Sequence, residues 1–208
     1  MNKKKLIDQW TKLKIITNKR VLSAFKKIKR EDFVVKEFIK DAYEDVPLPI
    51  LQHQTISQPT TVVIMLQALD VRLGMKILEI GAGSGYNAAL LSILVGKNGK
   101  VYTTEIVPEL AEFAKDNLKK FKNVEVHESD GSYGLPKLGK FDRIICTAAA
   151  KTIPKPLINQ LKEGGIIVIP VGPKYGQKMI KGIKYKGKLD TDSLGNFMFV
   201  PLTGEFGK

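Results

Sequence analysis

Short apolar runs alternate with segments of helical spacing over most of the chain. From residue 74 onward, the apolar runs predict strands and the helical spacing predicts the helices between them. Strands are predicted at residues 75–80, 100–105, 123–127, 141–147 and 165–171, and helices at 85–95, 108–120 and 154–161. This alternation implies right-handed crossovers and a mostly parallel sheet with helices on both faces. The predicted fold class is therefore α/β, with a Rossmann-like, doubly wound sheet.

The amino-terminal part of the chain has a different pattern. Apolar residues at helical spacing predict helices within residues 1–40, and Asn18 is placed to cap the second of them. Three prolines interrupt residues 41–59, so this stretch is predicted to be a loop. A helix is predicted at 59–69, with Ser57 where a cap residue would lie.

The segment around residues 76–86 combines a buried strand, a tight glycine turn and a helix start. Such a unit is typical of nucleotide-binding folds, because glycines allow a sharp turn and free N–H groups at the helix start face the ligand. Gly81, Gly83 and Gly85 do not have the G-x-G-x-x-G spacing of dinucleotide sites. Glu79 would repel a pyrophosphate but suits a cationic ligand. S-adenosylmethionine fits, because it carries an ammonium and a sulfonium group and no phosphate.

Two further acids support this cofactor. Glu105 ends the next predicted strand, where a carboxylate can accept both hydroxyls of a ribose. Asp130, followed by Gly131, comes after the third strand, at a position that can meet an adenine amino group. Because ligands of parallel sheets bind at the carboxyl ends of the strands, Glu79, Glu105 and Asp130 are expected on one rim.

The residue pattern near the carboxyl terminus predicts that the last strands run antiparallel. Residues 178–185 and 197–202 are expected to form an antiparallel pair, separated by a polar turn region at 187–195. With 208 residues, the chain is expected to be a single domain. It would consist of a helical N-terminal segment with the active-site loop (1–58) and a cofactor-binding α/β core (59–208).

The composition limits which binding partners and which cellular location are expected. The net charge of +13 comes mostly from lysines spread along the whole chain. Because base and phosphate recognition favours arginine, we interpret the charge as a solvated surface and expect no nucleic-acid partner. The single cysteine, Cys146, excludes an internal disulfide and suits a reducing cytoplasm. No apolar run approaches the roughly 18 residues that span a membrane, so no membrane partner is expected. No metal is expected as a partner either.

Further motifs are spread along the chain, at residues 41–50, 54–59, 130–131, 147–150, 153–154, 168–172 and 199–203. Together with the glycine turn, their order and spacing resemble the protein-L-isoaspartate O-methyltransferase family of class I S-adenosylmethionine-dependent methyltransferases. The glycine turn is shared by the whole superfamily. The Thr-Ile-Ser at 55–57 and the Val-Pro-Leu-Thr at 200–203 are specific to this family.

The resemblance implies a repair reaction. A methyl group would pass from S-adenosylmethionine to the α-carboxyl of an L-isoaspartyl residue in a damaged protein, leaving S-adenosylhomocysteine. The ester would collapse to a succinimide, whose hydrolysis returns some normal aspartate. A carboxylate is already ionised at neutral pH, so the site must mainly desolvate it and align it with the methyl group.

The resemblance also implies a role for each matching residue. Ser57 would be the catalytic hydroxyl that orients the carboxylate. Substrate contacts would come from Ser57 and from backbone groups of Thr147, Ala148 and Ala149. Cofactor contacts would come from Gln54, Thr55, Ile56, Glu79, Gly81, Ala82, Gly83, Ser84, Gly85, Glu105, Ile106, Asp130, Gly131 and Thr203.

The chain departs from the family pattern in the loop before Ser57. It has Leu51 and His53 where the family usually has glycines. Because glycines beside an active site allow a positive φ or a close approach, their replacement predicts a different loop path, a tighter pocket or altered substrate choice.

Other functions remain open from the sequence. The charge suggests a methyltransferase for RNA, but residues 146–150 read Cys-Thr-Ala-Ala-Ala and lack the Asn/Asp-Pro-Pro-aromatic motif of base-directed enzymes. A small-molecule methyltransferase could share the glycine turn, but it would not explain residues 55–57 or 200–203. A cofactor-binding protein without activity is disfavoured by the intact acids and Ser57.

Overall fold

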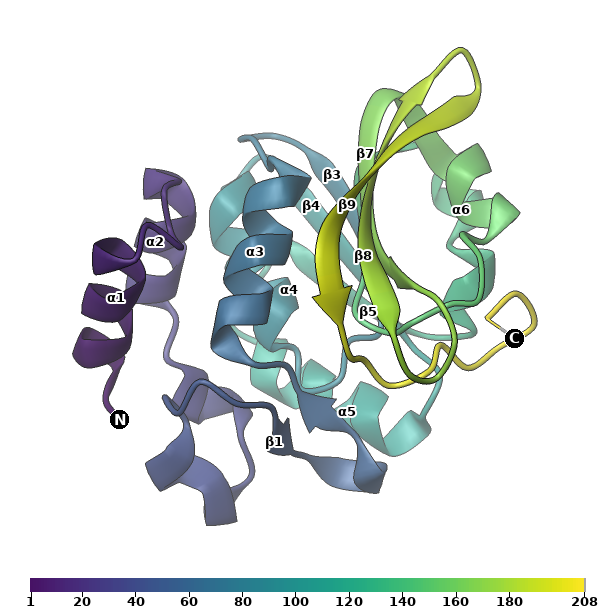
Figure 1. Ribbon diagram of the computed structural model, residues 1–208. Helices are drawn as coiled ribbons and strands as arrows, with labels where there is room; N and C mark the ends of the chain where they lie inside the picture. Colours follow the sequence, from purple (N-terminus) through teal and green to yellow (C-terminus); the bar gives the residue numbers. More distant parts are fainter. Residues whose placement is uncertain (208) are drawn as a thin grey trace.

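A seven-stranded sheet forms the centre of the computed structural model, which describes residues 1–207 (Figure 1). Its first five strands are parallel and its last two are antiparallel. In spatial order the strands are β5 (Val124–Glu128), β4 (Lys100–Glu105), β3 (Lys76–Ile80), β6 (Phe141–Cys146), β7 (Leu161–Val171), β8 (Gln177–Tyr185) and β9 (Lys188–Phe197). The predicted mostly parallel α/β fold is confirmed.

Helices cover both faces of the sheet. One face packs against α3 (Pro59–Leu69), α4 (Tyr86–Val95) and α5 (Pro108–Leu118). The other face packs against the short helix α6 (Lys155–Gln160) and 3₁₀ turns at Gly131–Tyr133 and Pro136–Leu138. The central strand β3 is buried from Ile77 to Ile80, because it is covered on both sides. Continuous burial is why its sequence is an unbroken apolar run apart from Glu79.

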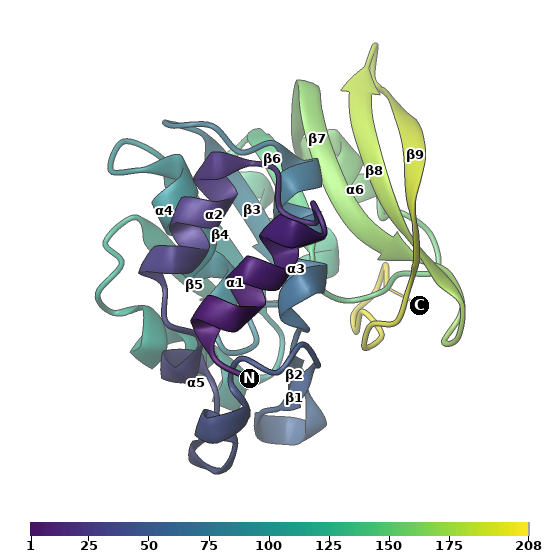
Figure 2. The ribbon, with the colours of Figure 1, turned by 60° about the vertical axis from the view of Figure 1, so that its left-hand side comes forward.

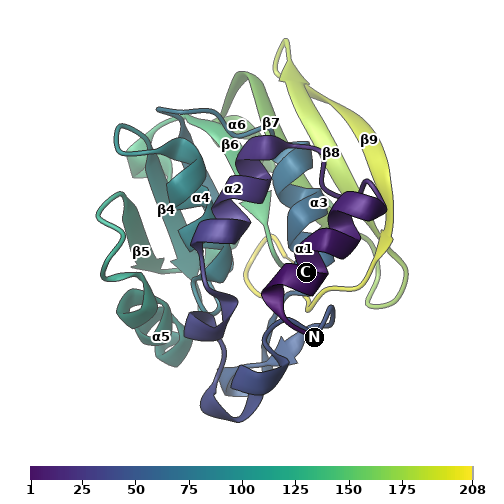
Figure 3. The ribbon, with the colours of Figure 1, turned by 90° about the vertical axis from the view of Figure 1, so that its left-hand side faces the viewer.

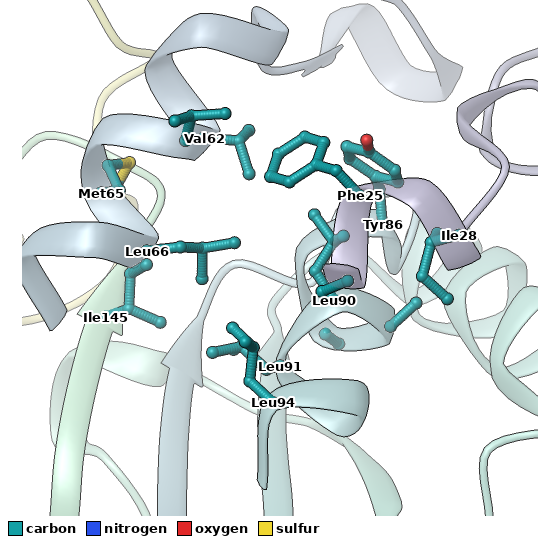
Figure 4. Close-up of a cluster of buried hydrophobic side chains, with 14 of the residues drawn as sticks. Phe25, Ile28, Val62, Met65, Leu66, Tyr86, Leu90, Leu91, Leu94 and Ile145 are labelled. Atoms are coloured by element: carbon teal, nitrogen blue, oxygen red, sulfur yellow. The ribbon is translucent and has the colours of Figure 1, made fainter. Parts of the chain in front are cut away.

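The amino-terminal helices form an outer layer. α1 (Lys3–Lys12) and α2 (Lys19–Lys27) lie over α3 and α4 (Figures 2 and 3). Aromatic side chains join the layers: the ring centroids of Trp10 and Phe25 are 5.2 Å apart, and those of Phe25 and Tyr86 are 6.2 Å apart. Figure 4 shows Phe25 and Tyr86 beside Val62 of α3 and Leu90 of α4. The outer helices are therefore part of the same core as the sheet.

The helices α2 and α3 receive their side-chain caps from different sources. Asn18 caps α2 as predicted, because its side-chain oxygen accepts from the amides of Arg20 and Val21 at 2.9 and 3.2 Å. Ser57 does not cap α3, contrary to the prediction, because Gln58 occupies the cap position. The acceptor comes instead from Asp45, whose carboxylate accepts from the amide of Thr60 at 2.9 Å.

The loop before α3 contains a small hairpin. Strand β1 (Leu48–Pro49) pairs with β2 (Thr55–Ile56), and a 3₁₀ turn, η3 (Leu51–His53), joins them. Gln52 and His53 have φ values of 53° and 56°, in the left-handed region that favours glycine. The second of these residues stands where the family usually has a glycine. The hairpin therefore keeps a left-handed backbone at 53 although the side chain is a histidine.

The carboxyl-terminal strand lies earlier than predicted. The predicted pair at 178–185 and 197–202 is wrong in its second member: β9 covers Lys188–Phe197, and residues 186–187 form the turn. The error has a physical reason. β9 is an edge strand that is exposed along most of its length, so it lacks the alternating apolar pattern of a half-buried strand. After β9 the chain crosses the carboxyl ends of the parallel strands (Figure 1).

The contribution of the Asp45 cap to the stability of α3 can be tested. In addition to the Thr60 amide, Asp45 accepts from the Thr60 hydroxyl at 2.6 Å, and that hydroxyl accepts from the Trp10 indole at 2.7 Å. We expect Asp45→Ala to lower the free energy of unfolding by about 1–2 kcal/mol, as loss of an N-cap does. Urea unfolding measures this, with Asp41→Ala at a neighbouring exposed position as the control. Equal stability of the two variants would contradict the cap.

Candidate cofactor and substrate pocket

One cavity lies at the carboxyl ends of β3, β4 and β6, where the sequence predicted a ligand rim. Six segments that are distant in the sequence line it: the loop before α3, the glycine turn, the end of β4, the turn after β5, the loop after β6 and the carboxyl-terminal segment. The predicted site residues among its lining are Gln54, Thr55, Ile56, Ser57, Gly81, Ala82, Gly83, Ser84, Glu105, Ile106, Gly131, Thr147, Ala148 and Thr203. The fold thus brings most of the predicted set together.

Four predicted residues do not line the cavity: Glu79, Gly85, Asp130 and Ala149. The cavity also has walls that sequence reasoning missed. These are Val62 and Met65 of α3, Ile80 and Thr104 at strand ends, Tyr86 and Asn87 of α4, Val107 and Leu110 at the start of α5, and residues 200–202. The aliphatic residues among them carried no signal of a site, because buried apolar positions occur throughout any core.

The glycine turn needs its glycines for two reasons. Gly81, Gly83 and Gly85 have φ values of 89°, 53° and 84°, which side chains rarely adopt. A Cβ on Gly81 would also lie 2.6 Å from Oγ1 of Thr147. The Thr147 hydroxyl donates to the carbonyl of Gly81 at 2.8 Å. The turn therefore presents bare backbone to the cavity and is held by Thr147, the residue that follows β6.

The carboxylate of Glu105 fixes the other side of the turn. Its Oε2 accepts from the amide of Gly83 at 2.9 Å, and its Oε1 accepts from the amides of Ile106 and Val107 at 2.9 and 3.1 Å. The residue is buried yet lines the cavity. Because a carboxylate can accept about four hydrogen bonds, room remains for a ligand hydroxyl. The predicted ribose contact is compatible with this geometry and stays a prediction.

Glu79 lies beneath the cavity. Its side chain is fully buried and accepts from Nδ2 of Asn87 at 2.7 Å, while Oε2 has no partner among residues 1–207. Burial raises the pKa of this carboxyl to about 7. Asn87 lines the cavity, so Glu79 can influence a ligand through it.

Asp130 fastens the carboxyl-terminal segment. Its carboxylate accepts from the amides of Ser132 and Glu205 at 2.8 and 2.9 Å. Burial alone would raise its pKa, but these hydrogen bonds hold the pKa below the usual value. A Cβ on Gly204 would lie 2.1 Å from Oδ1 of Asp130. The structure therefore gives Asp130 a fastening role, and the adenine contact predicted for it stays a prediction.

Ala149 has a similar structural role. Its amide donates to the carbonyl of Val200 at 2.8 Å, and its carbonyl accepts from the amide of Leu202 at 2.8 Å. Both backbone groups are therefore engaged with the carboxyl-terminal segment. A substrate contact through the Ala149 amide would require its bond to Val200 to open, whereas the carbonyl can accept a second hydrogen bond.

The hairpin before α3 reaches the glycine turn. A Cβ on Gly83 would lie 3.6 Å from Cδ1 of Ile50, which places the start of the hairpin in contact range of the turn. His53 is exposed, and Gln54 beside it lines the cavity. The exposed position agrees with a loop histidine that is not part of the cavity wall.

Comparison with known proteins places the chain in a family. The family model described as protein-L-isoaspartate(D-aspartate) O-methyltransferase matches residues 1–207. The protein-L-isoaspartate O-methyltransferase of Methanococcoides burtonii is 47% identical over 92% of this chain and 95% of its own length.

Comparison with solved structures indicates the same family. A protein-L-isoaspartate O-methyltransferase covers 99% of this chain and 67% of its own, with a TM-score of 0.91 and 30% identity. A Plasmodium falciparum structure, described as such a methyltransferase in complex with S-adenosyl-L-homocysteine, covers 98% of this chain and 99% of its own, with a TM-score of 0.86 and 26% identity.

The chain belongs to the protein-L-isoaspartate O-methyltransferase family. It is therefore a methyltransferase that uses S-adenosylmethionine and acts on isoaspartyl residues of proteins. Among residues 1–207, no group of three or more His, Cys, Asp and Glu side chains could hold a metal ion. Over the same residues, every helix is too short or too polar to cross a bilayer.

The buried Glu79 predicts a pH dependence of stability. Its pKa rises from 4.5 to about 7 on folding, so the folded protein holds a proton that the unfolded chain releases between these values. The stabilising contribution of the neutral carboxyl is therefore full below about pH 4.5 and is lost as the pH rises through about 7. Relative to Glu79→Gln, the unsubstituted protein should lose up to about 3 kcal/mol of unfolding free energy from acid to mildly alkaline pH.

Urea unfolding at a series of pH values measures this difference. Glu37→Gln, at an exposed position, is the control and should follow the unsubstituted protein at every pH. A Glu79→Gln curve parallel to that of the unsubstituted protein would contradict a raised Glu79 pKa.

Proposed function

We propose that this cavity carries out the family reaction, with Ser57 orienting the α-carboxylate of an L-isoaspartyl residue toward the methyl group of S-adenosylmethionine. The observation that carries the proposal is that Ser57 and the glycine turn line one cavity, although they belong to different segments of the chain. A hydroxyl on one wall and bare backbone on the other provide two adjoining subsites, one for a carboxylate and one for a cofactor.

The residues present fit the cofactor. Gly81 and Gly83 line the cavity without side chains, and Glu105 places a carboxylate at the end of β4. Acidic rather than basic residues suit a ligand without phosphate. In the proposed complex, residues 81–85 hold the methionine end, Glu105 and Ile106 hold the ribose, and Gly131 with Asp130 lies at the adenine. Gln54, Thr55, Ile56 and Thr203 close the cavity from the two flanking segments.

The reaction does not require a side chain to act as an acid or a base. When bound, S-adenosylmethionine supplies an activated methyl group, which forms an ester bond to the carboxylate oxygen as its bond to sulfur breaks. No proton moves in this step, because the carboxylate is ionised at neutral pH and the sulfonium becomes a neutral thioether. The chain must therefore hold the carboxylate in line and exclude water. Ser57 can donate one hydrogen bond to the carboxylate oxygen that does not react.

We further propose that the chain acts as one domain, in the cytoplasm, and without a nucleic-acid partner. The buried free thiol of Cys146 supports a reducing compartment. The joint core of the outer helices and the sheet supports a single unit, because residues 1–58 and 59–207 share buried contacts. The even spread of lysines along the chain supports a general surface charge.

A paired-peptide assay tests the proposed substrate. Labelled methyl groups should pass to a peptide that contains one L-isoaspartyl residue and not to the same sequence with L-aspartyl. The physical reason is that the extra backbone carbon of the isoaspartyl form moves its free α-carboxylate relative to the flanking peptide. Equal labelling of the two peptides, or labelling of neither, would overturn the proposal.

Replacement of Ser57 tests its role. Ser57→Ala should lower kcat by about 10–100-fold and change the Kd of S-adenosylhomocysteine by less than about threefold, because the lost hydrogen bond orients the substrate and not the cofactor. Initial rates and calorimetry separate the two quantities. Ser23→Ala, at an exposed position of α2, is the control. An unchanged kcat for Ser57→Ala would remove the serine from the reaction.

A further inference from the structure

Arg30 is a fully buried cation at the base of the loop that leads to Ser57. Its side chain has no exposed surface. The ion pairs found among residues 1–207 do not include it. A buried charge without a partner is costly, so its surroundings must compensate for the lost water.

Backbone carbonyls provide that compensation, and all of them belong to one loop. The Arg30 guanidinium donates to the carbonyl oxygens of Ala42, Val46 and Ser57. The distances from Nη2 are 3.3 Å to Val46 and 3.0 Å to Ser57. The Arg30 guanidinium therefore binds the segment 42–57 at three positions, including its two ends.

The bond to Ser57 has a particular consequence. Ser57 lies between β2 and α3 and belongs to neither, and its side chain does not cap the helix. Its carbonyl is thus fixed by the Arg30 guanidinium rather than by a strand or a helix. Because the carbonyl and the side chain share one Cα, a fixed carbonyl restricts where the Ser57 hydroxyl can point.

Arg30 is itself held on the opposite side. Its amide donates to the hydroxyl of Tyr43 at 3.2 Å, and that hydroxyl donates to Glu31. A small void beside Arg30 is lined by Tyr86, the first residue of α4 after the glycine turn. Arg30 and Tyr86 border the same void, so the base of the Ser57 loop lies near the element that begins at the glycine turn.

We propose that Arg30 is a positioning residue for methyl transfer: its guanidinium sets the place of Ser57 relative to the glycine turn. The inference rests on the role proposed for Ser57. A lysine at 30 keeps the charge, but its donors radiate from one nitrogen and do not reproduce the flat fork with which Nη1 and Nη2 of Arg30 reach separate carbonyls. A loss of geometry rather than of charge is therefore the expected effect of Arg30→Lys.

The chain offers a control arginine that also donates to backbone carbonyls, although it is exposed where Arg30 is buried. Arg20 also donates to two backbone carbonyls, those of Val71 and Leu94, and these lie at the far ends of α3 and α4 from Ser57. Arg20→Lys thus removes the same kind of interaction from the same amino-terminal layer. The two variants separate a general loss of stability from a loss of positioning.

The experiment measures kcat with an isoaspartyl peptide, the Kd of S-adenosylhomocysteine and the melting temperature for both variants. Rates are taken well below each melting temperature and divided by the fraction of protein that binds S-adenosylhomocysteine. Arg30→Lys should lower kcat by about tenfold with less than about threefold change in Kd, since small displacements of a positioned group have large effects on rate. Arg20→Lys should lower the melting temperature and leave kcat within about twofold.

Equal kcat values for the two variants, in the presence of full activity of the unsubstituted protein, would overturn the role of Arg30 and leave the proposed function intact. An unsubstituted protein without activity toward the isoaspartyl peptide would overturn both. Tyr43→Phe is a milder second variant if Arg30→Lys does not fold. It removes the hydroxyl that anchors Arg30 and should lower kcat about twofold to threefold, and an unchanged kcat would count against the proposal.

Discussion

The hydrogen bond from the Gly83 amide to the Glu105 carboxylate joins the ends of two neighbouring parallel strands, and the site depends on it. β3 and β4 are parallel neighbours and end at the same edge of the sheet. The turn after β3 therefore meets Glu105, the acid that ends β4. Glu105 also accepts the first amides after β4. A single carboxylate therefore fixes both backbone segments that face the proposed cofactor.

Two segments from opposite ends of the chain complete the cavity above this edge. The amino-terminal loop is held by charged groups at its base: Asp45 accepts from the start of α3, and Arg30 donates to three loop carbonyls. The carboxyl-terminal segment is held by Asp130 and by the backbone of Ala149. In both cases buried or half-buried polar groups bind backbone atoms of segments outside the seven-stranded sheet. The sheet edge thus supplies one wall of the cavity and the two segments supply the others.

The regular parts of this structure could be predicted because burial leaves a pattern in the sequence. The strand β3 is an apolar run apart from Lys76 and Glu79, β4 and β6 are buried along most of their length, and Asn18 has the side chain that an N-cap needs. The edge strand β9 could not be found in the same way, since exposed positions carry no alternation. The cap of α3 was misassigned because the acceptor, Asp45, is distant in sequence from the helix that it caps.

The site was predicted in outline more readily than in detail. The rim formed by the glycine turn and Glu105 follows from strand ends that meet at one edge, which the topology requires. The topology does not specify which groups surround each acid. Glu79 is buried beneath the cavity and Asp130 accepts amides of the carboxyl-terminal segment, because their partners come from Asn87 and Glu205, residues that no local pattern connects to them. The sequence likewise gave no reason to connect Arg30 with Ser57.

The most direct test of the account is a crystal structure of the protein with S-adenosylhomocysteine and a peptide that contains L-isoaspartate. The account predicts the nucleoside between the glycine turn and Glu105, with the α-carboxylate within hydrogen-bond distance of the Ser57 hydroxyl and facing the sulfur. A carboxylate bound away from Ser57, or a nucleoside outside this cavity, would contradict it.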